Sequence, residues 1–117
     1  MPRKQVSLWR ARAARLLEPY ARRRRFWRRV LEELAKGNRR RREVNVYHLD
    51  RSTKPGEVVF VPGKVLGSGL LKHQLTVGAF SFSKQALSKI ERAGGQALLL
   101  EEFLEKYPDG SGVRIIG

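Results

Sequence analysis

Arginine is the residue in this sequence that is best suited to a specific chemical task, and the arginines are concentrated near one end. Of the 25 Lys and Arg residues, 16 lie in the first 42 positions, where the acidic residues are Glu18, Glu32 and Glu33, so this segment has a net charge of +13. The other 75 positions carry nine basic and eight acidic residues, a net charge of +1. A charge asymmetry of this kind steers polyanions toward one part of a molecule.

The chemical type of the basic residues favours a nucleic-acid partner. Arg outnumbers Lys by 17 to 8, and the planar guanidinium group binds phosphate through two parallel hydrogen bonds and stacks on bases. Genomic bias or adaptation to heat would also raise the Arg content. The alternative to nucleic-acid binding is that the basic residues only form a solvated charged face of a helix. We predict that RNA contacts in this segment come from 15 of its 16 basic residues, namely Arg3, Lys4, Arg10, Arg12, Arg15, Arg22, Arg23, Arg24, Arg25, Arg28, Arg29, Arg39, Arg40, Arg41 and Arg42.

A glycine-rich segment at residues 62–69 is a second candidate for phosphate contact. It does not match a P-loop, because Val65 follows Lys64 where Ser or Thr is required, and it lacks the third glycine of a dinucleotide-binding fingerprint. Glycine lets a backbone either approach a phosphate closely or adopt a positive φ in a tight turn, and both explanations remain open. We predict a second RNA contact here, made by Lys64, Gly67, Gly69 and Lys72.

No constellation of side chains indicates catalysis or metal binding. The sequence has no Cys, and neither His48 nor His73 has another His at ligand spacing. Ser68, His73 and Asp109 include the residue types of a catalytic triad, but no nucleophile-elbow sequence accompanies them. We therefore predict that the protein is not an enzyme and uses no cofactor and no metal.

Length and apolar content bound the organisation of the chain. No stretch approaches the ~18 apolar residues of a membrane span, and the first residues do not resemble a secretory signal. We expect a soluble cytoplasmic protein with no membrane partner. The 117 residues predict a single domain overall, with a basic helical region at residues 1–42 and a compact α/β body at residues 43–117.

Two amphipathic helices are predicted to position the arginines. Residues 7–18 form the first, which Pro19 ends, and residues 21–36 form the second. Trp9 and Trp27 lie on the apolar stripes, so we expect them to pack between elements rather than to stack on bases. Residues 22–25, all Arg, would lie in the first turn of the second helix, where the helix dipole disfavours cations. We interpret this conflict as a phosphate site, because a bound anion would remove it.

Short strands and helices follow one another after Arg42. Strands are predicted near residues 44–47, 58–61, 75–80, 97–99 and 113–116. Ser83 caps a predicted helix that stops at Gly94, and residues 100–107 form another. This order predicts an α/β (α+β mixed) body beneath a helical arm.

Several ordered motifs of the body resemble one known family. Residues 61–69 (VPGKVLGSG), 75–83 (LTVGAFSFS) and 90–95 (IERAGG) resemble the archaeal and eukaryotic large-subunit ribosomal protein eighteen, the "e" type, which shares its body fold with bacterial large-subunit protein fifteen. The resemblance extends over nearly the whole chain, and the length fits a short archaeal form.

This resemblance implies a structural constituent of the large (50S) ribosomal subunit, without enzymatic activity. Its partners would be large-subunit ribosomal RNA and neighbouring ribosomal proteins, and its body would be an irregular β-β-α superhelix flanked by helices. A free-standing nucleic-acid-compacting protein is the alternative that the charge pattern also allows.

Overall fold

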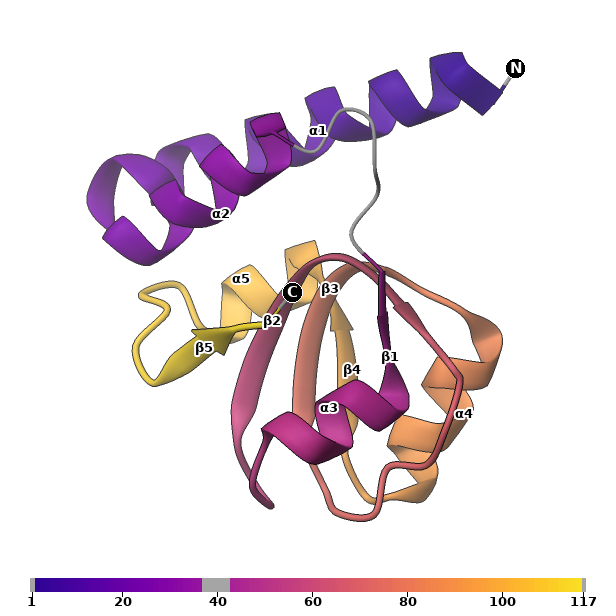
Figure 1. Ribbon diagram of the computed structural model, residues 1–117. Helices are drawn as coiled ribbons and strands as arrows, with labels where there is room; N and C mark the ends of the chain where they lie inside the picture. The colour runs from indigo at the N-terminus through magenta and orange to yellow at the C-terminus, as the bar shows by residue number, and fades with distance from the viewer. Residues whose placement is uncertain (1, 37–42, 117) are drawn as a thin grey trace.

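The computed structural model confirms a mixed α/β fold (Figure 1). It describes residues 2–36 and 43–116, and the side chains of residues 11–35 and 43–116. In chain order the elements are α1 (Pro2–Arg23), α2 (Arg25–Lys36), β1 (Glu43–Asn45), α3 (Val46–Ser52), β2 (Val58–Leu66), β3 (Thr76–Phe82), α4 (Lys84–Arg92), β4 (Gln96–Leu99), α5 (Leu100–Lys106) and β5 (Val113–Ile115).

A parallel sheet forms the centre of the body. Its strands follow the order β1-β2-β3-β4. The free edge of β2 is shared by two short strands: β5 pairs with the beginning of β2, and β1 pairs with the end of β2. Parallel strands need a connection that returns across the sheet. Between β3 and β4 that connection contains α4, whereas residues 67–75 return from β2 to β3 without a helix. This loop must therefore lie close against its neighbours.

Helices cover both faces of the sheet, and the side chains of β2 alternate between them. Phe60 packs in one apolar cluster with residues of α1, α2 and α5, whereas Val59 and Val61 pack in a second cluster with residues of α3 and α4. Figure 1 shows the α1–α2 hairpin above the sheet and α3 in front of it. The arm thus shares a core with the body.

The hairpin differs from the prediction at Pro19. Helix α1 continues through Pro19 to Arg23, and α2 begins at Arg25 rather than near residue 21. An interior Pro removes a backbone hydrogen bond and costs about 3 kcal/mol. Leu17 and Ala21, on either side of Pro19, are both buried in the shared core. The packing of this last turn offsets the local cost, so the prediction that the first helix ends at Pro19 was wrong.

Two further boundaries moved in the body. The strand predicted near residues 44–47 ends at Asn45, because Val46 and Leu49 are buried one turn apart on α3. Strand β2 continues through Pro62 to Leu66, with a register shift between Val61 and Lys64. The first part of the predicted glycine-rich loop is therefore strand. The N-cap at Ser83 is confirmed, since its Oγ accepts a hydrogen bond from the Ala86 N–H at 3.1 Å.

Candidate nucleic-acid interface

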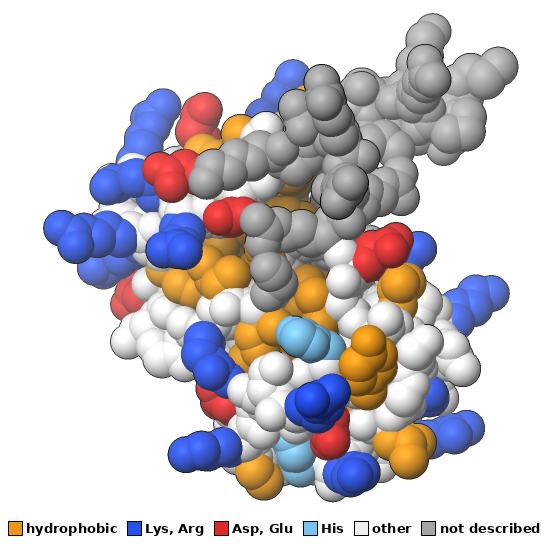
Figure 2. Space-filling model, viewed as in Figure 1, with side chains coloured by type: hydrophobic (Ala, Val, Ile, Leu, Met, Phe, Trp, Pro, Cys, Tyr) orange, Lys and Arg blue, Asp and Glu red, His pale blue; other side chains and the backbone are white. Residues whose placement is uncertain are grey.

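The described arginines of the hairpin all point their side chains into solvent. Figure 2 shows Lys and Arg side chains gathered at the turn between α1 and α2. The exposed residues are Arg12, Arg15, Arg22, Arg23, Arg24, Arg25, Arg28 and Arg29. The opposite side of each helix supplies buried side chains to the core, including Leu17 and Trp27. The amphipathic pattern thus fixes which face of the hairpin carries the charge.

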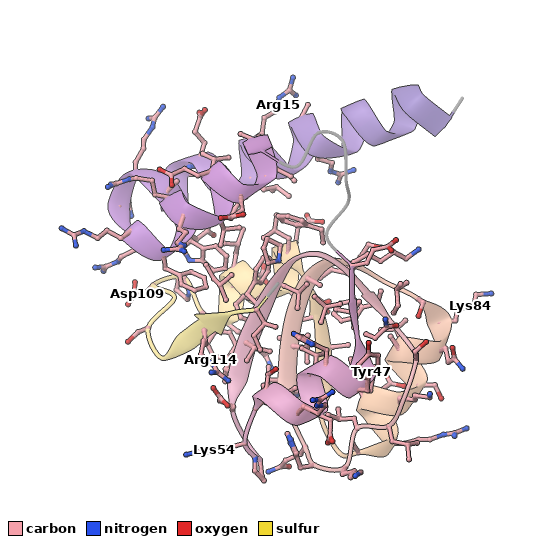
Figure 3. All side chains as sticks on the ribbon, viewed as in Figure 1. Arg15, Tyr47, Lys54, Lys84, Asp109 and Arg114 are labelled. Carbon is pink, nitrogen blue, oxygen red and sulfur yellow. The ribbon has the colours of Figure 1, made fainter. Side chains whose placement is uncertain are left out.

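The turn of the hairpin is fastened to the C-terminal part of the chain. The indole of Trp27 is fully buried, and its Nε1–H donates to the Pro108 carbonyl at 2.9 Å. Phe26 packs against Gly110, where a Cβ would lie 2.5 Å from its ring. The Arg24 Nε lies 3.1 Å from the Asp109 Oδ1. Figure 3 shows Asp109 beside the hairpin turn. These contacts hold the backbone of the hairpin turn against the body.

The four consecutive arginines do not share one helix start, so the prediction that they all lie in the first turn of the second helix was wrong. Their contact with RNA phosphates stays a prediction. Arg22 and Arg23 lie in the last turn of α1, where the carbonyl end of the dipole favours cations. Arg24 stands between the helices, with its N–H donating to the Tyr20 carbonyl at 2.9 Å and its carbonyl accepting from the Arg28 N–H at 3.1 Å. Of the four, Arg25 alone opens α2, which has no acidic residue in its first turn.

Intramolecular partners use part of this charge. Glu18 lies 3.5 Å from Arg22 across one turn of α1, and the Arg28 Nε–H donates to the Ala21 carbonyl at 3.3 Å. Both members of the Glu18–Arg22 pair are largely exposed, so the pair contributes little to stability. Within the described side chains, Arg23, Arg25 and Arg29 have no carboxylate partner.

Several residues predicted to bind RNA lie where their side chains are not placed. Arg3, Lys4 and Arg10 belong to α1, but their side chains are outside the described set. Arg39, Arg40, Arg41 and Arg42 lie outside the described residues, as does the side chain of Trp9.

The glycines of the loop are explained by packing inside the protein. Gly69 has φ of +90°, and a Cβ there would clash with Tyr47. Gly67 is buried, and a Cβ there would lie 2.6 Å from the Gln85 Cβ. The Lys89 Nζ donates to the carbonyls of Gly67 at 2.6 Å and Gly69 at 2.5 Å. RNA contact is not required to account for either glycine.

The two lysines grouped with this loop are not brought together. Lys64 is half-buried near the carboxyl end of β2, in register with Glu43 of β1 and Ser81 of β3. Lys72 is exposed, and its N–H donates to the Asp50 Oδ1 at 2.8 Å, near the amino end of β3. Their contact with RNA stays a prediction.

The described residues form no catalytic or metal-binding cluster. His73 lies 3.8 Å from Asp50, whereas Asp109 pairs with Arg24. Ser68, His73 and Asp109, which have the residue types of a catalytic triad, therefore do not form one. In residues 2–36 and 43–116 no group of three potential ligands could hold a metal ion. No helix in the described part of the chain combines the length and apolar character needed to cross a membrane.

Charge counting missed three residues that shape this surface. Asp109 pairs with Arg24 at the surface, Lys89 positions the glycine-rich loop, and Tyr47 presents an exposed ring beside that loop. Asp109 lies 85 positions from Arg24, and Lys89 lies at least 20 positions from the loop glycines that it contacts. No local pattern could therefore have identified these two residues.

This chain is similar to known ribosomal proteins. Residues 29–98 match the model of a family of ribosomal proteins whose description names 50S-L15 and 50S-L18e together with a protein of the 60S subunit. A large ribosomal subunit protein eL18 from Sulfurisphaera tokodaii is 50% identical over 91 residues, 78% of this chain and 77% of its own. Its counterpart from Archaeoglobus fulgidus is 50% identical over 90 residues, 77% of each chain. The eL18 of Methanopyrus kandleri is 48% identical over 95 residues, 77% of this chain and 75% of its own. The chain therefore belongs to this family of ribosomal proteins.

Proposed function

We propose that this protein is a structural constituent of the large ribosomal subunit and binds ribosomal RNA chiefly through the arginines of the α1–α2 hairpin. Membership in a ribosomal-protein family supports assembly into the subunit, a cytoplasmic, ribosome-associated location and a role without enzymatic activity. The observation that supports the hairpin as the main contact is its set of eight exposed arginines on a firmly packed support.

The mechanism is neutralisation of closely packed phosphates. Each guanidinium offers a planar set of donors that matches a phosphate group. Because A-form RNA hides its base edges in a deep, narrow major groove, such contacts position the protein and read the shape of the RNA. Arg23, Arg25 and Arg29 are the natural first contacts, since the described structure gives them no competing carboxylate.

Rigid support of the hairpin improves binding. Ordering a long flexible arm at the moment of association would cost conformational entropy for each residue fixed. Here the apolar stripe of the hairpin is already packed against Phe60, Phe80 and Phe103. The described arginines then lose mainly side-chain freedom when RNA binds.

A charge-matched pair of variants tests the proposal. One variant replaces Arg22, Arg23, Arg25 and Arg29 with Gln. The control replaces four exposed basic residues of the body, Lys54, Lys84, Arg92 and Lys106, with Gln, and so removes the same net charge. RNA affinity is measured as a function of salt with a fragment of large-subunit RNA. With the duplex-DNA coefficient of about −0.9 per neutralised phosphate, the log–log slope of the hairpin variant should become shallower by up to ~3.6.

The control should change the salt slope much less. Equal slopes for the two variants would mean that net charge alone, and not the hairpin, governs binding. A free-standing compacting protein would bind unrelated duplexes as tightly as ribosomal RNA and would leave large subunits in a high-salt wash. The proposed function requires preference for the ribosomal RNA and co-sedimentation through that wash.

A further inference from the structure

Tyr47 presents an aromatic ring to solvent although its backbone is held tightly. The residue is 44% exposed, while its neighbours Val46 and Leu49 supply the buried contacts of α3. The Tyr47 N–H donates to the Ser68 carbonyl at 3.0 Å, and its Cβ packs against Gly69, where no side chain is tolerated. The ring thus projects from a fixed base without contributing to the core.

The glycine-rich loop serves as that base. Its backbone uses four polar groups inside the protein: the carbonyls of Gly67 and Gly69 accept from Lys89, the Ser68 carbonyl accepts from Tyr47, and the Ser68 N–H donates to the Asn45 Oδ1 at 3.3 Å. The positive φ of Gly69 lets the loop pass directly under Tyr47. The arrangement positions an exposed ring, which a purely structural loop does not need.

The surroundings of the ring are cationic. Arg51 lies one helical turn beyond Tyr47 and is exposed. Lys72 is also exposed, in the loop between β2 and β3, and its N–H is hydrogen-bonded to Asp50 of α3. The acidic residue of this helix, Asp50, is turned inward with a side chain only 15% exposed, accepting from the Lys72 N–H and facing His73. The face around Tyr47 therefore combines an aromatic ring with two exposed basic side chains.

We propose that Tyr47 is a stacking platform for an unpaired RNA base, and that Arg51 and Lys72 bind the adjoining phosphates. This inference rests on the proposed function, since it assumes an RNA partner. An unpaired base has a free face for stacking, whereas a base inside a duplex does not. Exposed positive charge near the ring favours a nucleic acid over an apolar protein surface.

This contact is separate from the hairpin. The hairpin packs on the Phe60 face of the sheet, and α3 packs on the Val59 face. In Figure 3, Tyr47 lies across the view from Asp109 and the hairpin turn. The two surfaces would therefore engage different segments of RNA and hold them a fixed distance apart.

Binding of two simple probes tests the proposal. The probes are a single-stranded oligoadenylate and a self-complementary RNA duplex with the same number of phosphates. Affinities are measured for the full chain and for Tyr47→Ala, Tyr47→Leu and Tyr47→Phe, each also in the background in which the four hairpin arginines are Gln. Tyr47→Ala and Tyr47→Leu should lower the oligoadenylate affinity about 5- to 150-fold, the loss expected for one base stacked on an aromatic ring. Tyr47→Phe should bind nearly as the parent, and the duplex affinity should not change.

Ultraviolet cross-linking gives a second readout. A bound oligoadenylate should attach to the tryptic peptide of residues 43–51, which contains Tyr47. Leu70→Ala is the control, because Leu70 is 66% exposed in the same loop but is not aromatic. It should leave oligoadenylate binding unchanged.

The outcomes separate this proposal from the proposed function. If the parent protein binds neither probe nor ribosomal RNA, the proposed function fails. If the parent binds and Tyr47→Ala binds equally well, the stacking platform is refuted while the hairpin function stands. If Tyr47→Ala keeps its RNA affinity but no longer co-sediments with large subunits, the face contacts a protein, which also refutes the platform.

Discussion

Replacing Trp27 with Ala should release the hairpin from the sheet and destabilise the whole protein. Trp27 is fully buried where hairpin and body meet, with ring centroids 5.5 Å from Phe60, 5.8 Å from Phe103 and 4.7 Å from Phe26. Truncating a buried Trp to Ala typically costs about 3–5 kcal/mol. That is a large part of the total stability of an ordinary domain, about 5–15 kcal/mol.

A more conservative variant separates the contribution of the ring packing from that of the indole hydrogen bond. Trp27→Phe keeps most of the ring packing but removes the indole N–H that donates to the Pro108 carbonyl. A hydrogen bond of this kind contributes about 0.5–1.5 kcal/mol. With the smaller cavity included, we expect a loss of about 1–3 kcal/mol, clearly below that of the Ala variant.

The assay is urea unfolding followed by far-ultraviolet circular dichroism, which does not depend on the removed fluorophore. The parent should unfold in a single transition, because α1, α2, β2 and α5 share one apolar cluster. Leu99→Ala is the control, since Leu99 is 49% exposed and should change stability by less than about 0.5 kcal/mol. A Trp27→Ala protein within about 1 kcal/mol of the parent would refute the shared core, as would separate transitions for helices and sheet in the parent.

Further substitutions test the loop and the cap. Gly69→Ala should destabilise the isolated protein by clearly more than Gly112→Ala in thermal melts, because both glycines have positive φ but a Cβ at Gly112 meets nothing within 4 Å. Gly67→Ala should also lower the melting temperature, through contact with Gln85 rather than strain; melts equal to the parent would contradict the packing described. Lys89→Met should cost about 1.5–3 kcal/mol in urea unfolding, because two loop carbonyls lose a charged donor. Ser83→Ala should cost about 1 kcal/mol and Ser83→Asp much less, and equal losses would argue against the cap.

Patterns of neighbouring residues were sufficient to predict much of this protein. Charge counting located the exposed arginines, because a charged side chain without a buried partner stays in solvent whatever the fold. Helical spacing of apolar residues correctly placed Trp27 in the core, and the cap at Ser83 depends on a hydrogen bond across only three positions. The ordered motifs of the body identified the family, as the match over residues 29–98 confirms.

Long-range packing determined the rest. A local rule ends a helix at Pro19, but burial of Leu17 and Ala21 against distant residues continues it to Arg23 and so divides the arginine run between two helices. The glycines at positions 67 and 69 were interpreted as a phosphate contact. The structure explains them instead by contacts with Gln85, Tyr47 and Lys89, which no spacing rule reveals. The exposed ring of Tyr47 emerged in the same way, since its setting depends on the Ser68 carbonyl in a loop far along the chain. The composition of the chain can be counted directly from its sequence. The contacts between distant side chains depend on how the helices pack on the two faces of the sheet.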